Sequence, residues 1–164
     1  VGYRYYETFG VAPAFEFGYG LSYTTFDIGK LSLSSKKFSG KIAATVRVKN
    51  TGKVAGKEVV QLYLAAPAGK LHKPALELKG FAKTRLLQPG ESQILSFELS
   101  PRNLASFDPA VSSWIAEAGK YTVKIGASSR DIRQTASFAL DRDLTVKKDS
   151  IALVPRDSIN ELKK

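Results

Sequence analysis

Histidine and cysteine, two side chains often used in catalysis and in transition-metal binding, are almost absent from this 164-residue sequence. His72 is the single histidine and cysteine is absent, which excludes a histidine-rich metal site, a cysteine-ligated metal site and a thiolate nucleophile. A Ser-His-Asp triad would have to use His72, but its setting in Lys-Leu-His-Lys-Pro is typical of an exposed loop. We therefore expect no metal ion and no cofactor.

Two carboxylates would suit acid–base or nucleophilic chemistry by residue type alone, namely Asp108 and Glu117. Asp108 stands before Pro109 and Glu117 before Ala118-Gly119, which favours roles in a turn or at the rim of a domain. The closely spaced Gly18 and Gly20 lack the spacing of a phosphate-binding loop, so a sharp turn of the backbone explains them better. The sequence predicts no catalytic residue.

Aromatic side chains are the remaining candidates for a binding function. Trp114, the single tryptophan, lies in a short stretch typical of a strand. Packing in the core or at a sheet edge is its favoured role, and contact with a sugar ring is the alternative. Tyr121 is in phase with Val123 and Ile125, so we expect it in the core.

The first 26 residues hold nine of the sixteen Phe and Tyr side chains, without the periodicity of a helix or a strand. We expect this segment to be an irregular linker that lies against a neighbouring surface. Its glycines would allow close approach of the backbone to that surface. The predicted interface residues are Tyr3, Tyr5, Phe17, Gly18, Tyr19, Gly20 and Tyr23.

The net charge of +10 is concentrated in the middle of the chain, where residues 27–140 carry 18 basic and 8 acidic side chains. These cations mostly occur singly and alternate with apolar residues, as expected on the solvated face of a sheet. We therefore expect no nucleic-acid partner, since such a partner requires cations that cluster on one face. No stretch approaches the roughly 18 consecutive apolar residues of a membrane helix.

The middle of the chain reads as about seven short strands separated by turn signals, which predicts an all-β antiparallel sandwich of two sheets. Ser100-Pro101 opens a short helical turn between two of them. The predicted core comprises Val46, Val48, Leu62, Leu64, Leu95, Phe97, Val123, Ile125 and Phe138. We assign 1–26 to the linker, 27–140 to the sandwich and 141–164 to a C-terminal extension, which either adds a strand or lies loose.

Ordered motifs between residues 1 and about 140 resemble the C-terminal domain of glycoside hydrolase family 3, together with the junction ahead of it. They are Gly-Tyr-Arg-Tyr-Tyr at 2–6, Phe-Glu-Phe-Gly-Tyr-Gly-Leu-Ser-Tyr-Thr at 15–24, Val-Lys-Asn-Thr-Gly at 48–52, Gly-Lys-Glu-Val-Val-Gln-Leu-Tyr at 56–63, Leu-Lys-Gly-Phe at 78–81, Leu-Gln-Pro-Gly-Glu at 87–91 and Gly-Ala-Ser-Ser-Arg-Asp at 126–131. The resemblance implies an immunoglobulin-like sandwich of the fibronectin type III-like kind.

The same resemblance implies a non-catalytic accessory domain of a β-glucosidase or β-xylosidase. Its partners would be the upstream catalytic domains and, as a second option, another copy of the chain. The family nucleophile is an Asp in a Ser-Asp-Trp context, whereas Ser113-Trp114 lacks the Asp. The sequence opens within a motif at Val1, so we expect a fragment or processed product of a periplasmic or secreted enzyme.

Two other classes of function remain open from the sequence alone. A stand-alone carbohydrate-binding module would need exposed coplanar aromatic rings. A basic module that binds anionic polymers would need its lysines clustered on one face. The directions in which Trp114 and the lysines point distinguish these classes from the accessory domain.

Overall fold

The strands of this protein pair into sheets, and the sheets pack against one another through the buried residues of each strand. The computed structural model describes residues 1–150 and Asp157. In the first sheet, called here the β3 sheet, β3 pairs with β6 on one side and with β1 and β2 on the other, always antiparallel. Its strands are β1 (Phe26–Ile28), β2 (Ser32–Leu33), β3 (Ile42–Asn50) and β6 (Ser92–Leu99).

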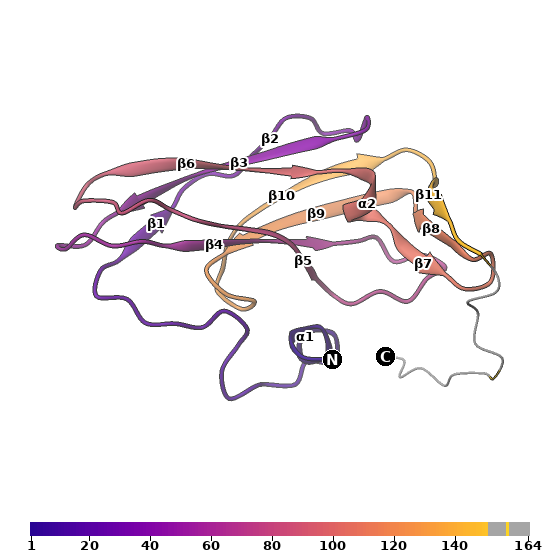
Figure 1. Ribbon diagram of the computed structural model, residues 1–164, viewed down its shortest axis with the longest axis horizontal. Helices are drawn as coiled ribbons and strands as arrows, with labels where there is room; N and C mark the ends of the chain where they lie inside the picture. Colours follow the sequence, from indigo (N-terminus) through magenta and orange to yellow (C-terminus); the bar gives the residue numbers. More distant parts are fainter. Residues whose placement is uncertain (151–156, 158–164) are drawn as a thin grey trace.

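The second sheet, the β4 sheet, has the antiparallel order β10-β9-β4-β5. Its strands are β4 (Val59–Ala65), β5 (Glu77–Lys83), β9 (Gly119–Gly126) and β10 (Ile132–Leu140). A third, small sheet of order β11-β8-β7 lies at one end of the sandwich (Figure 1). It consists of β7 (Ser106–Asp108), β8 (Ser113–Ala116) and β11 (Leu144–Lys148).

The core lies between the β3 and β4 sheets and consists of the inward residues of each strand. Every residue of the predicted core is buried, with exposures from 0% at Val48 to 8% at Phe97. Along β3 the buried residues alternate with Arg47 and Lys49, which are exposed. The predicted antiparallel sandwich of two sheets is confirmed, and β3 carries cations on its solvent face as predicted.

Two short helices complete the described part of the chain. Helix α2 (Pro101–Leu104) forms at the predicted turn, where the Ser100 N–H donates to Asn103 Oδ1 at 2.8 Å. Helix α1 (Tyr3–Phe9) departs from the expectation that the whole 1–26 segment is irregular. It ends at Gly10, whose left-handed backbone lets its N–H bond to the carbonyl of Tyr6.

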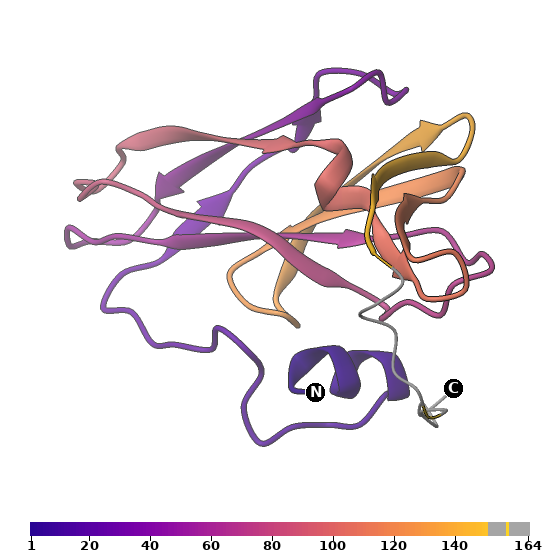
Figure 2. The same ribbon diagram turned by 45° about the vertical axis from the view of Figure 1, so that its right-hand side comes forward.

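The first 26 residues cross the outer face of the β4 sheet, where α1 lies below β4 and β5 in both views (Figures 1 and 2). Gln61 and Tyr63 of β4 point to this face, yet they are only 6% and 0% exposed. These two side chains hydrogen-bond to each other. The N-terminal segment therefore provides a cover that the outer face of β4 requires.

The C-terminal extension contributes one strand, since β11 pairs antiparallel with β8. This resolves the open choice for residues 144–148 in favour of an added strand, while residues 151–156 and 158–164 lie outside the described part. Within the described residues there is no helix long and apolar enough to cross a membrane.

A candidate interaction surface on the N-terminal segment

Helix α1 docks on the sandwich through several side chains, of which Tyr3 and Glu7 lie one turn apart on the same face. The Tyr3 ring meets Tyr63 edge-on, with centroids 5.7 Å apart, and its hydroxyl accepts the Leu78 N–H at 2.8 Å. Glu7 pairs with Arg130, which donates from Nε at 2.8 Å. Tyr3 thus satisfies a backbone donor of β5 while it covers β4.

The chain after α1 is fastened to the loop between β9 and β10. The Ser129 N–H donates to the carbonyl of Phe17 at 2.9 Å, and the Ser128 hydroxyl donates to Glu16 at 3.0 Å. Arg130 adds a bond from its guanidinium to the carbonyl of Val11 at 2.8 Å. This loop therefore holds the segment at several points.

Gly18 explains why the backbone can come so close to the sheet. Its φ is +89°, and a Cβ at this position would overlap the side-chain amide of Gln61. The positive φ disfavours any other residue, and a side chain here would also have to displace the Gln61 amide. Gly20 has no positive φ, and no atom lies within 4 Å of the position that a Cβ would take there. Of these two glycines, only Gly18 therefore brings the backbone close to the sheet.

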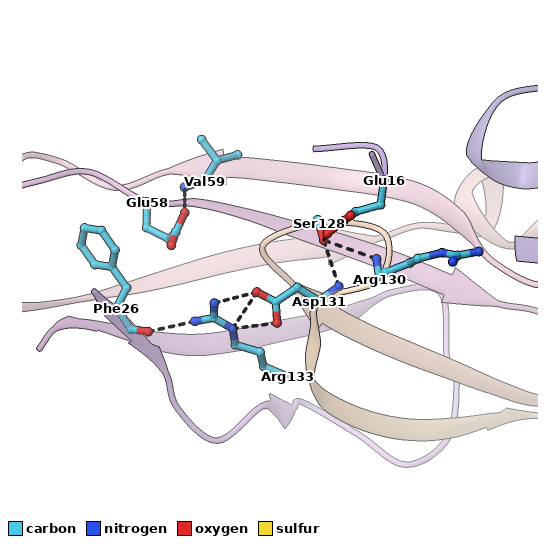
Figure 3. Close-up of polar contacts among 8 residues, drawn as sticks. All are labelled: Glu16, Phe26, Glu58, Val59, Ser128, Arg130, Asp131 and Arg133. Atoms are coloured by element: carbon cyan, nitrogen blue, oxygen red, sulfur yellow. Dashed lines mark hydrogen bonds and ion pairs between the residues drawn. The ribbon is translucent and has the colours of Figure 1, made fainter. Parts of the chain in front are cut away.

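The β9–β10 loop is itself braced by a network of hydrogen bonds (Figure 3). Ser128 Oγ accepts the Asp131 N–H at 2.9 Å, and the Asp131 carboxylate receives both ends of the Arg133 guanidinium. Arg133 also donates to the carbonyl of Phe26 at 2.8 Å. The hydrogen bonds that Arg133 donates to the Asp131 carboxylate raise the pKa of Arg133 further, so its guanidinium stays charged at neutral pH. The loop is thereby a fixed support.

A groove of about 560 Å³ runs between the N-terminal segment and this loop. Glu58 and Lys57 line it on the β4 side, and Arg133 lines it on the loop side. The Glu58 carboxylate accepts the Val59 N–H at 2.9 Å, and partial burial raises the pKa of Glu58 above its ordinary value. The groove is therefore mixed in charge.

The segment also exposes apolar side chains, two of which, Tyr19 and Leu21, lie at the groove. Phe15 is 71% exposed, Tyr19 51%, Leu21 90% and Tyr23 fully exposed. Phe15 and Tyr19 contact each other, with ring centroids 5.2 Å apart. We call these four residues the aromatic surface.

Of the predicted interface residues, the structure therefore seats two against the protein's own sandwich, Tyr3 and Gly18. Phe17 packs on Tyr3 and is also partly exposed, since its ring centroid lies 5.2 Å from that of Tyr3 and the residue remains 49% exposed. Tyr5 is 38% exposed and packs on Phe9. Sequence reasoning missed Gln61 and Tyr63, because the continuous apolar run of β4 hides which of its residues point outward.

The residues considered for catalysis occupy separate structural positions. His72 is exposed, as predicted. Asp108 accepts the Ala110 N–H at 2.9 Å, which is the predicted turn role. Glu117 does not lie at an exposed rim, because it is 7% exposed and forms a buried ion pair with Lys73. No group of metal-binding side chains occurs among the described residues.

Comparison with known proteins relates this arrangement to larger enzymes. Residues 58–129 match the fibronectin type III-like domain family. The chain is 47% identical over 140 residues to β-glucosidase BoGH3A of Bacteroides ovatus, covering 84% of the chain and 19% of that protein. It is 42% identical to thermostable β-glucosidase B of Acetivibrio thermocellus, covering 90% of the chain and 20% of that protein.

Solved structures agree with these sequence matches. β-Glucosidase 3B of Thermotoga neapolitana, in complex with α-D-glucose, superposes with a TM-score of 0.84 at 51% identity. The match covers 90% of this chain and 20% of that one. The chain thus spans about a fifth of the length of the relatives it matches, at their C-terminal end.

Proposed function

The chain belongs to the fibronectin type III-like domains, with their preceding linker, of the C-terminal region of family 3 β-glucosidases, and on this premise we propose that it braces the catalytic domains of such an enzyme. The observation that carries the proposal is that the N-terminal segment is both anchored and exposed. Some of its residues are fastened to β4 and the β9–β10 loop, and others expose the aromatic surface. An exposed apolar patch flanked by polar groups is typical of an interaction site.

The fastening gives the brace its stiffness. A linker that only joined two domains would not need the Tyr3 hydroxyl to accept an N–H of β5. Nor would it need Arg130 to donate to both Glu7 and the carbonyl of Val11. Because the segment cannot move freely on the sandwich, any domain that packs on the aromatic surface is held in one orientation. The groove beside Glu58 offers polar contacts at the edge of the same interface.

The hydrolytic activity itself would reside in the upstream domains. Glycoside hydrolysis generally needs two carboxyl groups on either side of the scissile bond. Here Asp108 caps a turn and Glu117 is paired with Lys73, so neither is available for such a role. We expect the chain alone to hydrolyse no aryl β-glucoside, and turnover that disappears in Asp108→Asn or Glu117→Gln would contradict this.

The bracing role is tested by comparing one substitution in two settings. Tyr23→Ser should change the free energy of unfolding of the 164-residue chain by less than about 0.5 kcal/mol, because Tyr23 is fully exposed there. In the full-length enzyme it should cost about 1.5–3 kcal/mol, since a buried aromatic contact is lost. Ile94→Ser is the control, as Ile94 is 63% exposed on the opposite sheet. Equal effects of Tyr23→Ser in both settings would contradict the proposal.

A second copy of the chain is the alternative partner that could pack on the aromatic surface. It predicts that the 164-residue chain dimerises in sedimentation experiments and that Tyr23→Ser abolishes the dimer. A monomer at all concentrations leaves the upstream domains as the partner.

A further inference from the structure

A second pocket, of about 400 Å³, lies between β5 and the β7–β8 hairpin and shares no lining residue with the groove. Two aromatic rings form one of its walls. Phe107 of β7 and Trp114 of β8 are paired across the hairpin, and each is 39% exposed. Their ring centroids are 5.6 Å apart and their planes meet at 57°. The pair therefore forms an angled platform rather than a flat stack.

Hydrogen bonding fixes the orientation of the tryptophan. The indole Nε1–H donates to Asp149 Oδ2 at 2.9 Å, and Asp149 is itself held by an ion pair with Lys147. The polar edge of the ring is thus occupied by the protein. The face that lines the pocket remains available for a ligand.

Charged groups line the pocket beside the rings. Glu77 is 18% exposed and accepts from Arg4 at 3.1 Å and from Lys79 at 3.0 Å. A carboxylate has about four acceptor sites, so Glu77 retains capacity for a further donor. Arg102 also lines the pocket and makes no hydrogen bond or ion pair with any other described residue. The pocket thus offers an oriented acceptor and a free planar donor next to an aromatic wall.

We propose that this pocket binds one pyranose unit of an oligosaccharide. A pyranose ring has a face of C–H groups, which packs on an aromatic ring, and a rim of hydroxyls, which both donate and accept hydrogen bonds. Trp114 and Phe107 supply the first contact, Arg102 donates to ring hydroxyls, and Glu77 accepts from them. Few polar groups placed around an apolar wall are typical of small-molecule sites.

The proposal is independent of the bracing role, because the pocket lies apart from the aromatic surface and its ligand is not a protein domain. It assigns a binding function to Trp114 in addition to its place in the small sheet. Arg102, which has no partner within residues 1–150, distinguishes the site from a purely structural packing of two rings, which would need no donor beside it.

The single tryptophan of the chain makes the site self-reporting. Titration of the 164-residue chain with cellotetraose, laminaritetraose and maltotetraose should give a saturable change in Trp114 fluorescence for at least one of them. Phe107→Ala and Arg102→Ala should each weaken the association constant at least about tenfold, which corresponds to about 1.4 kcal/mol. Ile94→Ala, on the opposite sheet, should leave it unchanged.

Thermal unfolding of each variant shows whether it is folded before its titration is interpreted. Calorimetric titration of Trp114→Phe adds a measurement that does not depend on fluorescence, and it should show the same loss. No saturable change with any of the three sugars at concentrations on the order of 10 mM would overturn the proposal. A response to inorganic phosphate but to no sugar would also overturn it, since it would indicate an anion site around Arg102.

Discussion

At the scale of single residues, the buried pair of Lys73 and Glu117 is the most consequential charge arrangement outside the candidate surfaces. Their side chains are 6% and 9% exposed. Glu117 also accepts the Lys70 N–H at 2.7 Å, so it holds the loop that follows β4. Burial by itself raises the pKa of Glu117, but the hydrogen bonds from Lys73 and Lys70 outweigh it and leave the pKa below its ordinary value.

We predict that Lys73→Met destabilises the chain by about 3–5 kcal/mol, because it leaves a buried carboxylate unpaired. The double variant Lys73→Met/Glu117→Leu should recover much of this loss, since no uncompensated charge remains. Chemical denaturation of the two variants measures the difference. Glu98→Gln is the matched control, because its pair with Lys41 is exposed and should matter little. Equal losses in the single and double variants would show that packing, not charge, dominates.

The same pair predicts a dependence of stability on pH. The folded-state pKa of Glu117 is lowered, so its contribution is fully present above the ordinary carboxyl pKa of about 4.3 and is lost as the pH falls through the folded value. The difference in unfolding free energy between wild type and Glu117→Gln should therefore shrink as the pH is lowered through this window. A difference that stays constant from neutral pH to below the window would contradict this assignment.

At the scale of elements, the sequence shows where strands lie better than it shows what covers them. Alternation identifies β3, β6 and β9, because one face of each is buried and the other is solvated. Strand β4 is buried on both faces, and its outer face is covered by a segment that begins more than 50 residues earlier in the chain. Such a contact leaves no local pattern, which is why Gln61 and Tyr63 could not be assigned to it.

Helix α1 shows the converse limitation. Its seven residues are too few for a periodic apolar stripe, and none of them is buried. It persists because Gly10 terminates it and because Tyr3 and Glu7 dock on the sandwich. The signal in the sequence was the glycine on either side of the segment, Gly2 and Gly10, and the four-residue spacing of Tyr3 and Glu7.

Anchoring of the N-terminal segment predicts different results at Gly18 and Gly20. Gly18→Ala should destabilise the contact by at least about 1 kcal/mol, because its φ is positive and its Cβ would overlap Gln61. Gly20→Ala should be nearly neutral, since nothing lies near its Cβ. Hydrogen exchange at Ser129, whose N–H bonds to Phe17, reports the anchoring directly. The same exchange rate in both variants would mean that Gly18 does not hold the segment.

At the scale of the whole molecule, the exposure of the tyrosines shows which of them are free to contact another domain and which are buried within this one. Tyr23 is fully exposed and Tyr19 is 51% exposed in this chain, whereas Tyr63 and Tyr121 are 0% exposed. The sandwich could be predicted from short apolar and alternating runs separated by turn signals, but the identity of a partner could not, because the partner's residues are not in this sequence. The measurement must therefore compare the chain with the full-length enzyme.

We predict that Tyr19 and Tyr23 are readily iodinated in the 164-residue chain and protected in the full-length enzyme, because the catalytic domains cover them there. Tyr63 and Tyr121 should remain unreactive in both and serve as internal controls for intact folding. Labelling of the chain over a range of concentrations separates the two candidate partners, since protection by a second copy must increase with concentration. Full reactivity of Tyr19 and Tyr23 in the intact enzyme would show that the aromatic surface faces solvent there, and the bracing contact would then have to involve the groove beside Glu58 alone.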